Sequence, residues 1–163
     1  MIKYENENAD RSITGKRVDI FSELCCMLPI SITNANVCII TKDGEHKEYY
    51  ERSLFDAFID MEEEELSFIK DYFGHLLEPK SLMKIKKENK RAYDLLMAIL
   101  AYKSKYGIEG VDVYEDEERF ISSFIIDFNK EEIVFYMIDS TADNEEDATK
   151  GIKINRNKEI ILS

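Results

Sequence analysis

The chain has 163 residues, and its 34 Asp and Glu against 22 Lys and Arg give a formal net charge of −12. This charge repels both the phosphate backbone of nucleic acids and an anionic membrane surface. We therefore expect the protein to bind neither of them directly. With 44% hydrophobic residues, 6 Gly and 2 Pro, the composition predicts one globular domain and leaves little room for linkers.

The compartment and the redox state follow from what the sequence lacks. No apolar run approaches the roughly 20 residues of a membrane-spanning helix, and the polar N-terminus does not resemble a signal peptide. The three cysteines, Cys25, Cys26 and Cys38, form neither a disulfide framework nor a zinc-binding spacing. We therefore expect a cytoplasmic protein with reduced thiols and no cofactor.

We expect residues 1–15 to be polar and weakly ordered and residues 16–163 to form one domain. Four apolar side chains recur at helical spacing, which predicts a helix that begins at Lys16 and ends before Pro29. These side chains are Phe21, Leu24, Cys25 and Leu28. Cys26 lies off this face, and so it is predicted to be the accessible thiol.

A β-hairpin is predicted next. Residues 37–40 and 47–50 favour strands, and Asp43-Gly44 is typical of a two-residue turn that needs a positive φ. Such a turn places Cys38 opposite Tyr49 and Ile40 opposite Lys47.

Helices are predicted in the middle of the chain. A segment capped at Ser53 and closed by Pro79 has an apolar stripe that is interrupted by four consecutive glutamates, where a break is possible. Residues 80–106 are expected to form one central helix that ends at Gly107.

The last third favours strands. Phe120, Phe124, Ile126 and Phe128 share one side of an alternating pattern, and a turn at Asn129-Lys130 pairs Phe124 with Phe135 and Ile126 with Ile133. An acidic loop, 139–147, leads to a hairpin of residues 152–154 and 160–162. The predicted fold class is α+β, with about three helices on one face of a mainly antiparallel sheet built from hairpins.

No catalytic or metal-binding motif is present. His46 and His75 are the two histidines available as a general base, and neither belongs to a recognisable arrangement. The loop 139–147 has oxygen side chains at alternate positions, but Asn144 and Lys150 stand where a calcium loop needs Gly and Glu. We therefore expect neither an enzyme nor a metal site.

The charges are segregated along the sequence. Residues 43–65 carry a net charge of −8 and residues 109–147 a net charge of −12, whereas residues 80–105 carry +6. Either the basic segment pairs internally with the acidic ones, or the acidic segments face a partner.

The first hypothesis is a non-enzymatic binding module: an inhibitor, immunity or counter-defence protein that blocks a basic nucleic-acid-processing protein by mimicking phosphates with carboxylates. Candidate aromatic anchors for such an interface are Tyr49, Tyr50 and Tyr114, and a place in the hydrophobic core is the alternative for each of them. The expected contact residues are Glu62, Glu63, Glu64, Glu65, Tyr114, Glu115, Asp116, Glu117, Glu118, Asp143, Glu145, Glu146 and Asp147. The oligomeric state is left open.

The alternative is a small-molecule binding or sequestering protein. Lys84, Lys87 and Arg91 recur at helical spacing and would together hold an anionic, nucleotide-like ligand.

Overall fold

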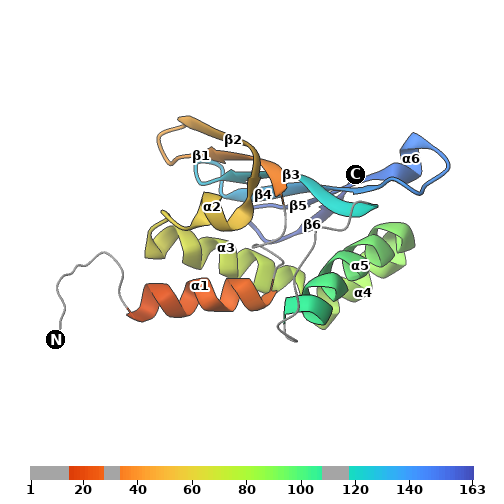
Figure 1. Ribbon diagram of the computed structural model, residues 1–163, viewed down its shortest axis with the longest axis horizontal. Coiled ribbons are helices and arrows are strands. Elements are labelled where there is room, and N and C mark those ends of the chain that lie inside the picture. The colour runs from red at the N-terminus through yellow and green to blue at the C-terminus, as the bar shows by residue number, and fades with distance from the viewer. Residues whose placement is uncertain (1–14, 28–33, 108–117) are drawn as a thin grey trace.

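The structure, a computed structural model, describes residues 15–27, 34–107 and 118–163. These residues form one six-stranded, mostly antiparallel mixed sheet and six helices (Figure 1). The α+β class is therefore confirmed, but the expected number of about three helices is too low. The segment expected to be weakly ordered lies, apart from Gly15, outside the described residues.

Along the described chain the strands come in three consecutive pairs, and helices precede each pair. The helices are α1 Gly15–Met27, α2 Leu54–Phe58, α3 Glu63–Leu76, α4 Pro79–Glu88, α5 Lys90–Gly107 and α6 Glu145–Ala148. The strands are β1 Asn34–Ile40, β2 His46–Ser53, β3 Arg119–Asp127, β4 Glu132–Asp139, β5 Thr149–Ile154 and β6 Ile160–Leu162.

The order across the sheet is β2-β1-β3-β4-β5-β6, and β1 and β3 are parallel. Hairpins alone therefore do not build this sheet, because a parallel pair needs a long crossover connection. Four helices, α2 to α5, lie in the chain between β2 and β3.

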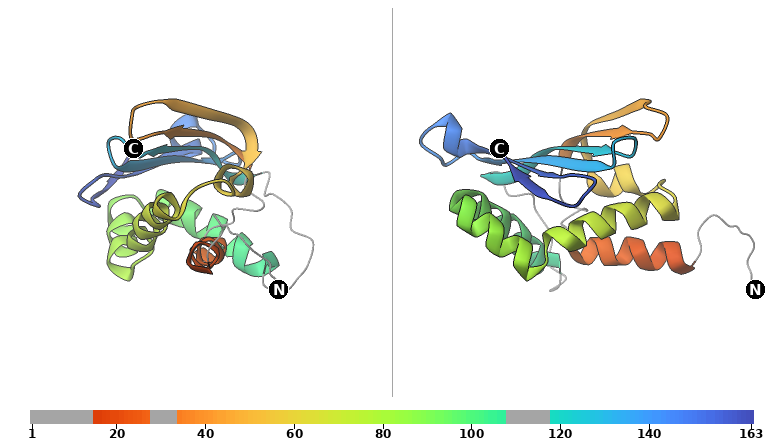
Figure 2. Two further views of the ribbon diagram at one scale, coloured as in Figure 1. Left: turned by 90° about the vertical axis from the view of Figure 1, so that its left-hand side faces the viewer. Right: turned by 180° about the vertical axis from the view of Figure 1, so that it is seen from behind.

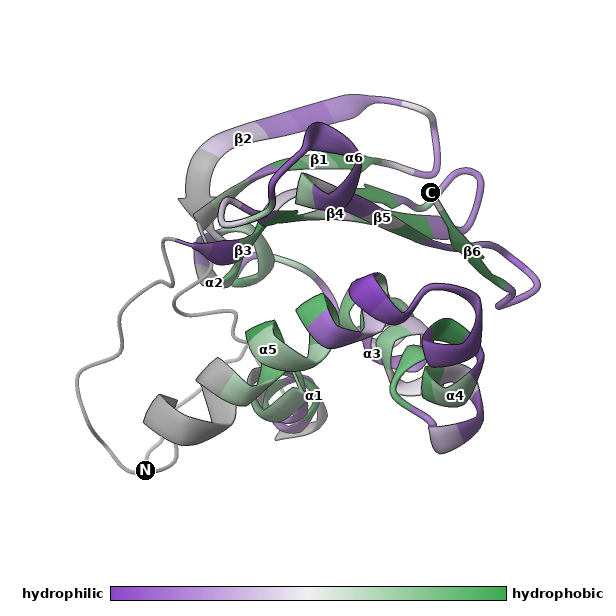
Figure 3. Ribbon diagram, turned by 90° about the vertical axis from the view of Figure 1, so that its right-hand side faces the viewer, coloured by the Kyte–Doolittle hydropathy of each residue, from purple (hydrophilic) through white to green (hydrophobic). Residues whose placement is uncertain are grey.

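Helices α1, α3, α4 and α5 lie on the same side of the sheet (Figures 1 and 2). Helix α3 packs against the central strands through Phe73, whose ring centroid lies 5.7 Å from those of both Phe124 and Phe135. All three rings are buried. Figure 3 shows β2 and α6 mainly in hydrophilic colours, in keeping with their positions at the margins of the sheet.

The loop between β1 and β2 is longer than the two-residue turn that the sequence predicts. The backbone N–H of Gly44 donates to the Thr41 carbonyl, and the N–H of Thr41 donates to the Glu45 carbonyl, both at 2.9 Å. Gly44 has a φ of 87°, as expected for this glycine. The result is a three-residue loop in which a turn is followed by a left-handed glycine.

The longer loop shifts the strand register by one residue, so the predicted pairs are wrong. The observed partners are Cys38 with Glu48 instead of Tyr49, and Ile40 with His46 instead of Lys47. Tyr49 instead lies opposite the buried Val37 and packs against the core. Cys38 is half-buried, and desolvation raises the pKa of its thiol.

The helix predicted over 80–106 is two helices that meet at Asn89. The backbone of Asn89 is extended, with φ −154° and ψ 92°, and its side-chain oxygen accepts a hydrogen bond from the N–H of Ala92. Asn89 therefore caps the start of α5. The break near the four glutamates is also present, between α2 and α3.

The C-terminal strands pair largely as the alternation predicts. Phe124 lies opposite Phe135 and Ile126 opposite Ile133, and β5 pairs with β6 in antiparallel orientation. A register irregularity between Ile121 and Ser123 changes the alternation, so that Ile121 is buried and Phe120 is half-exposed.

Gly151 of β5 lies so close to neighbouring side chains that a larger residue would not fit without a shift. A Cβ at this position would lie 2.8 Å from Cε1 of Tyr136, whereas a Cβ at Gly74 of α3 would lie 3.9 Å from Cε of Met27. We expect Gly151→Ala to lower the free energy of unfolding by about 1–3 kcal/mol through overpacking. Gly74→Ala is the matched control and should leave stability unchanged or raise it by up to about 1 kcal/mol. Urea unfolding of both variants measures this; equal effects would contradict the packing at Gly151.

Candidate functional site

Three segments that are distant in sequence bring eight carboxylates to one end of the molecule. They are the β1–β2 loop, the turn before α3 with the first turn of α3, and the beginning of α1. We call this surface the acidic end and define it by Asp19, Asp43, Glu45, Asp60, Glu62, Glu63, Glu64 and Glu65. The cations on the same described segments are Lys16, Arg17, Lys42 and Lys47. Carboxylates therefore outnumber cations here by two to one.

Arg17 holds α1 against the turn that precedes α3. Its Nε donates to the carbonyl of Met61 at 2.7 Å, and its Nη2 donates to the carbonyl of Ile59. The side chain is buried. These two hydrogen bonds join the beginning of α1 to the turn before α3, and so they hold two of the acidic segments together.

Lys42 connects the β1–β2 loop to α3. Its Nζ lies 3.6 Å from Oε2 of Glu64, and both side chains are at least three-quarters exposed. Water screens such a pair strongly, so Lys42 contributes little stability and leaves most of the negative potential in place.

The glutamate run also has a structural role. Oε1 of Glu65 accepts a hydrogen bond from the N–H of Glu62 at 3.0 Å, which satisfies a backbone donor at the start of α3. Four carboxylates at a helix N-terminus are stabilised by the helix dipole. Glu65 is therefore needed for the helix, whereas Glu64 is an exposed side chain available to a partner.

A groove of about 1050 Å³ begins at the acidic end and follows α1 and α3. Ile20 and Phe68 contribute apolar surface to it, and its acidic lining residues are Asp19, Glu23, Glu64, Asp71 and Glu78. The groove is therefore a place where an extended or helical segment with basic side chains would contact both carboxylates and apolar atoms.

Most carboxylates farther along the groove are paired. Glu23 lies 2.7 Å from Nζ of Lys70, and Asp71 lies 2.7 Å from Nζ of Lys158. The hydrogen bond to Asp71 raises the pKa of Lys158. Of the other lining acids, Glu78 lies 3.3 Å from Nδ1 of His75, whereas Asp19 and Glu64 belong to the acidic end.

The second predicted patch lies elsewhere. Glu145, Glu146 and Asp147 are in α6 and Asp143 shortly precedes it, at the opposite end of the sheet from the β1–β2 loop (Figure 1). In the same loop, hydrogen bonding by the Thr141 hydroxyl lowers the pKa of Asp139. The structure therefore does not bring the two predicted acidic patches together.

The third predicted patch is only partly described. Glu118 is exposed at the start of β3, whereas Tyr114, Glu115, Asp116 and Glu117 lie outside the described residues. Of the tyrosines named as anchors, Tyr49 is half-buried and Tyr50 is 66% exposed, with its hydroxyl donating to Glu48. This hydrogen bond raises the pKa of Tyr50.

The cations of the alternative hypothesis do not converge. Lys84 of α4 donates to the carbonyl of Ile160 at 2.8 Å, and Nε of Arg91 lies 3.3 Å from Asp147. Lys87 is exposed, and it lines a shallow surface of α4 together with Lys84 but without Arg91. The break at Asn89 separates Lys84 and Lys87 from Arg91, which counts against a shared ligand.

Each of the two histidines lies near a polar side chain of the described residues. His46 lies on the exposed strand β2, 3.9 Å from the Cys38 sulfur, and His75 lies 3.3 Å from a carboxylate oxygen of Glu78. Cys26 is exposed, as the helical pattern predicts.

In comparisons with models of known families, with curated proteins and with solved structures, the chain has no match. Within the part of the chain that the structure describes, no helix has both the length and the apolar character needed to cross a membrane. Within the same part, no group of three or more His, Cys, Asp or Glu side chains is arranged to hold a metal ion.

Sequence reasoning found the glutamate run but missed the residues that complete the acidic end. The acidic segment 43–65 contains Asp43, Glu45 and Asp60, so the charge count alone could have included them in the predicted surface. Asp19 belongs to no acidic block, and only the packing of α1 beside α3 brings it to the groove.

The fastening of the acidic end by Arg17 is testable. Arg17→Met keeps the aliphatic stem and removes the donors to Met61 and Ile59, so we expect the free energy of unfolding to fall by about 1.5–3 kcal/mol. Lys42→Met removes an equal charge from the exposed pair and should change stability by no more than about 0.5 kcal/mol. Chemical denaturation of both variants measures the difference. A loss of similar size in Lys42→Met would show that charge, and not the buried contacts, fastens this end.

Proposed function

We propose that this protein is a non-enzymatic binding module whose acidic end attracts and contacts a basic protein. The proposed partner is a protein that normally binds nucleic acid, because a surface of carboxylates presents the same charge as a phosphate backbone. Blocking such a partner would make the protein an inhibitor or immunity factor.

The observation that carries this proposal is that the basic segment of the chain leaves the acidic end uncompensated. Within the described residues, Lys84 and Lys90 pair at i, i+4 along α4 and α5, with Glu88 and Asp94. Arg91 pairs with Asp147, at the other end of the sheet. Internal neutralisation therefore does not account for the charges of the acidic end.

The geometry suggests how binding would proceed. Exposed carboxylates speed the encounter with a basic surface and make the association rate depend on salt. The groove then offers the partly exposed ring of Phe68 to apolar side chains of the partner, and such contacts hold a complex together. Charge would thus select the partner, and the groove would retain it.

The alternative of an anionic ligand held jointly by Lys84, Lys87 and Arg91 has less support, because Lys84 and Arg91 already have partners in different places.

Two double variants with equal charge changes test the proposal. Glu45→Lys with Glu64→Lys alters the acidic end and spares the capping residue Glu65, whereas Glu145→Lys with Glu146→Lys makes the same change on α6. Each immobilised protein is used to capture partners from a lysate of its source at low salt. We expect the wild type and the α6 variant to retain a basic protein that a high-salt wash releases, and the acidic-end variant to retain about tenfold less.

Equal capture by the two variants would contradict the assignment of binding to the acidic end. Capture of no basic, salt-sensitive protein by the wild type would contradict the proposed function itself.

A further inference from the structure

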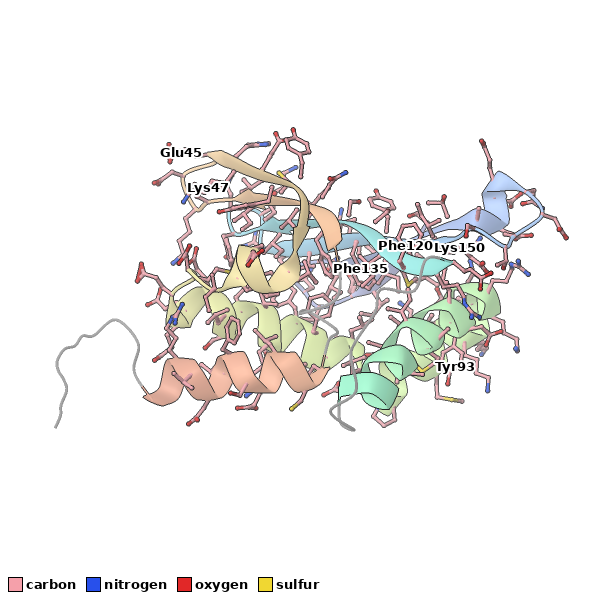
Figure 4. All side chains as sticks on the ribbon, viewed as in Figure 1. Glu45, Lys47, Tyr93, Phe120, Phe135 and Lys150 are labelled. Carbon is pink, nitrogen blue, oxygen red and sulfur yellow. The ribbon has the colours of Figure 1, made fainter. Side chains whose placement is uncertain are left out.

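The face of the sheet that points away from the long helices carries apolar side chains. Helices α1, α3, α4 and α5 all lie on the opposite side of the sheet (Figures 1 and 2). Phe135 of β4 points toward these helices (Figure 4) and packs against Phe73 of α3. Successive side chains of a strand point to opposite faces. Val134 and Tyr136, the neighbours of Phe135, therefore lie on the face that these four helices leave uncovered.

A continuous row of side chains crosses this face from β2 to β5. Cys38 of β1 lies opposite Ile125 of β3, and Ile125 lies opposite Val134 of β4. On the β2 side, the partner of Cys38 is Glu48. On the β5 side, the partner of Val134 is Lys153. The three central side chains are apolar and only half-buried, so each keeps apolar surface in contact with water.

Further apolar surface borders the row. Ile161 of β6 is the partner of Lys153 and is 45% exposed. Tyr50 of β2, whose hydroxyl donates to Glu48, is also exposed. We call the row together with Tyr50, Tyr136 and Ile161 the outer face. Six strands about 4.8 Å apart and about 23 Å long give roughly 550 Å² in projection, which upright side chains raise toward the roughly 800 Å² that each partner of a stable interface buries. Exposed apolar surface of this extent is typical of an interaction site.

The row is complementary to a second copy of itself. Ile125 is its centre, with an apolar side chain on either side, then the acid at one end and the base at the other. A two-fold axis that runs parallel to the strands and passes through this centre places Glu48 of each copy opposite Lys153 of the other. Lys153 also lies 3.5 Å from a carboxylate oxygen of Glu132 in its own copy, and the three donors of an ammonium group can serve both acids. Because the acid and the base of the row cancel, stacking two rows brings no excess of like charge together.

We propose that the outer face is the interface of a symmetric dimer, in which the sheets of two copies stack with their rows face to face. Stacked sheets lie about 10 Å apart with interdigitating side chains, so the apolar side chains of both copies are buried between them. The groove between α1 and α3 lies on the helix side of the sheet and stays accessible in each copy. The dimer does not depend on the proposed partner, and it presents two acidic ends at once.

Size-exclusion chromatography with light scattering tests the dimer on the purified protein alone, at about 100 μM, where an interface of micromolar affinity is occupied. Ile125→Lys places a charge at the centre of the row, whereas the control Met83→Lys makes the same change at a residue of α4 that is 64% exposed. We expect the mass of two chains for the wild type and for Met83→Lys. We expect the mass of one chain for Ile125→Lys, because its interface would bury two unpaired ammonium groups. A wild type with the mass of one chain, or an Ile125→Lys variant with the mass of two, would overturn the proposal.

A charge exchange tests the arrangement of the two copies and leaves the apolar part of the row unchanged. Glu48→Lys brings like charges together at both ends of the interface, and so does Lys153→Glu, so each variant should raise the dissociation constant of the dimer about tenfold. The double variant restores opposite charges and should return this constant to within about threefold of the wild type. Light scattering over a dilution series measures the constants. A double variant that dissociates as readily as the single variants would overturn the two-fold arrangement, because Glu48 and Lys153 would then not face each other.

Discussion

Packing of Phe73 against Phe124 and Phe135 determines where α3 lies on the sheet, and the positions of the functional surfaces follow from it. The three rings are buried, and each such burial contributes about 1.5–3 kcal/mol. With α3 fixed across the central strands, its N-terminal glutamates emerge beside the β1–β2 loop. The other side of α3 is then free to form a groove with α1.

The fold keeps its opposite charges apart. Helices α4 and α5 meet at the other end of the sheet, where Lys84 reaches the backbone of β6 and Arg91 reaches α6. The basic residues from Lys80 to Arg91 therefore do not neutralise the acidic end. A chain with a net charge of −12 thus has one strongly negative end, and the α6 loop forms a second negative region (Figure 1).

Local patterns predicted much of the fold. The helix before Pro29, the positive φ of Gly44 and the pairing of Phe124 with Phe135 all depend on neighbours in sequence. The register of β1 and β2 was missed because one added loop residue costs little, and because β2 has no apolar alternation that would fix which of its faces turns to the core. The parallel pairing of β1 with β3 was missed because it joins segments separated by four helices, which no local pattern reports.

The acidic end, too, combines features that the sequence predicts with features that only tertiary packing produces. The glutamate run is visible in the sequence, but its structural role through Glu65 and its union with Asp19 depend on tertiary contacts. Charge counts thus located the negative segments, whereas packing decided which of them share a surface.

Hydrogen–deuterium exchange of the protein alone and in complex with the captured partner is the most direct test of the central claim. The account predicts added protection in the β1–β2 loop, in the first turn of α3 and along the side of α1 that lines the groove. Protection confined to α6, or to α4 and α5, would contradict it, because binding would then use a surface other than the acidic end.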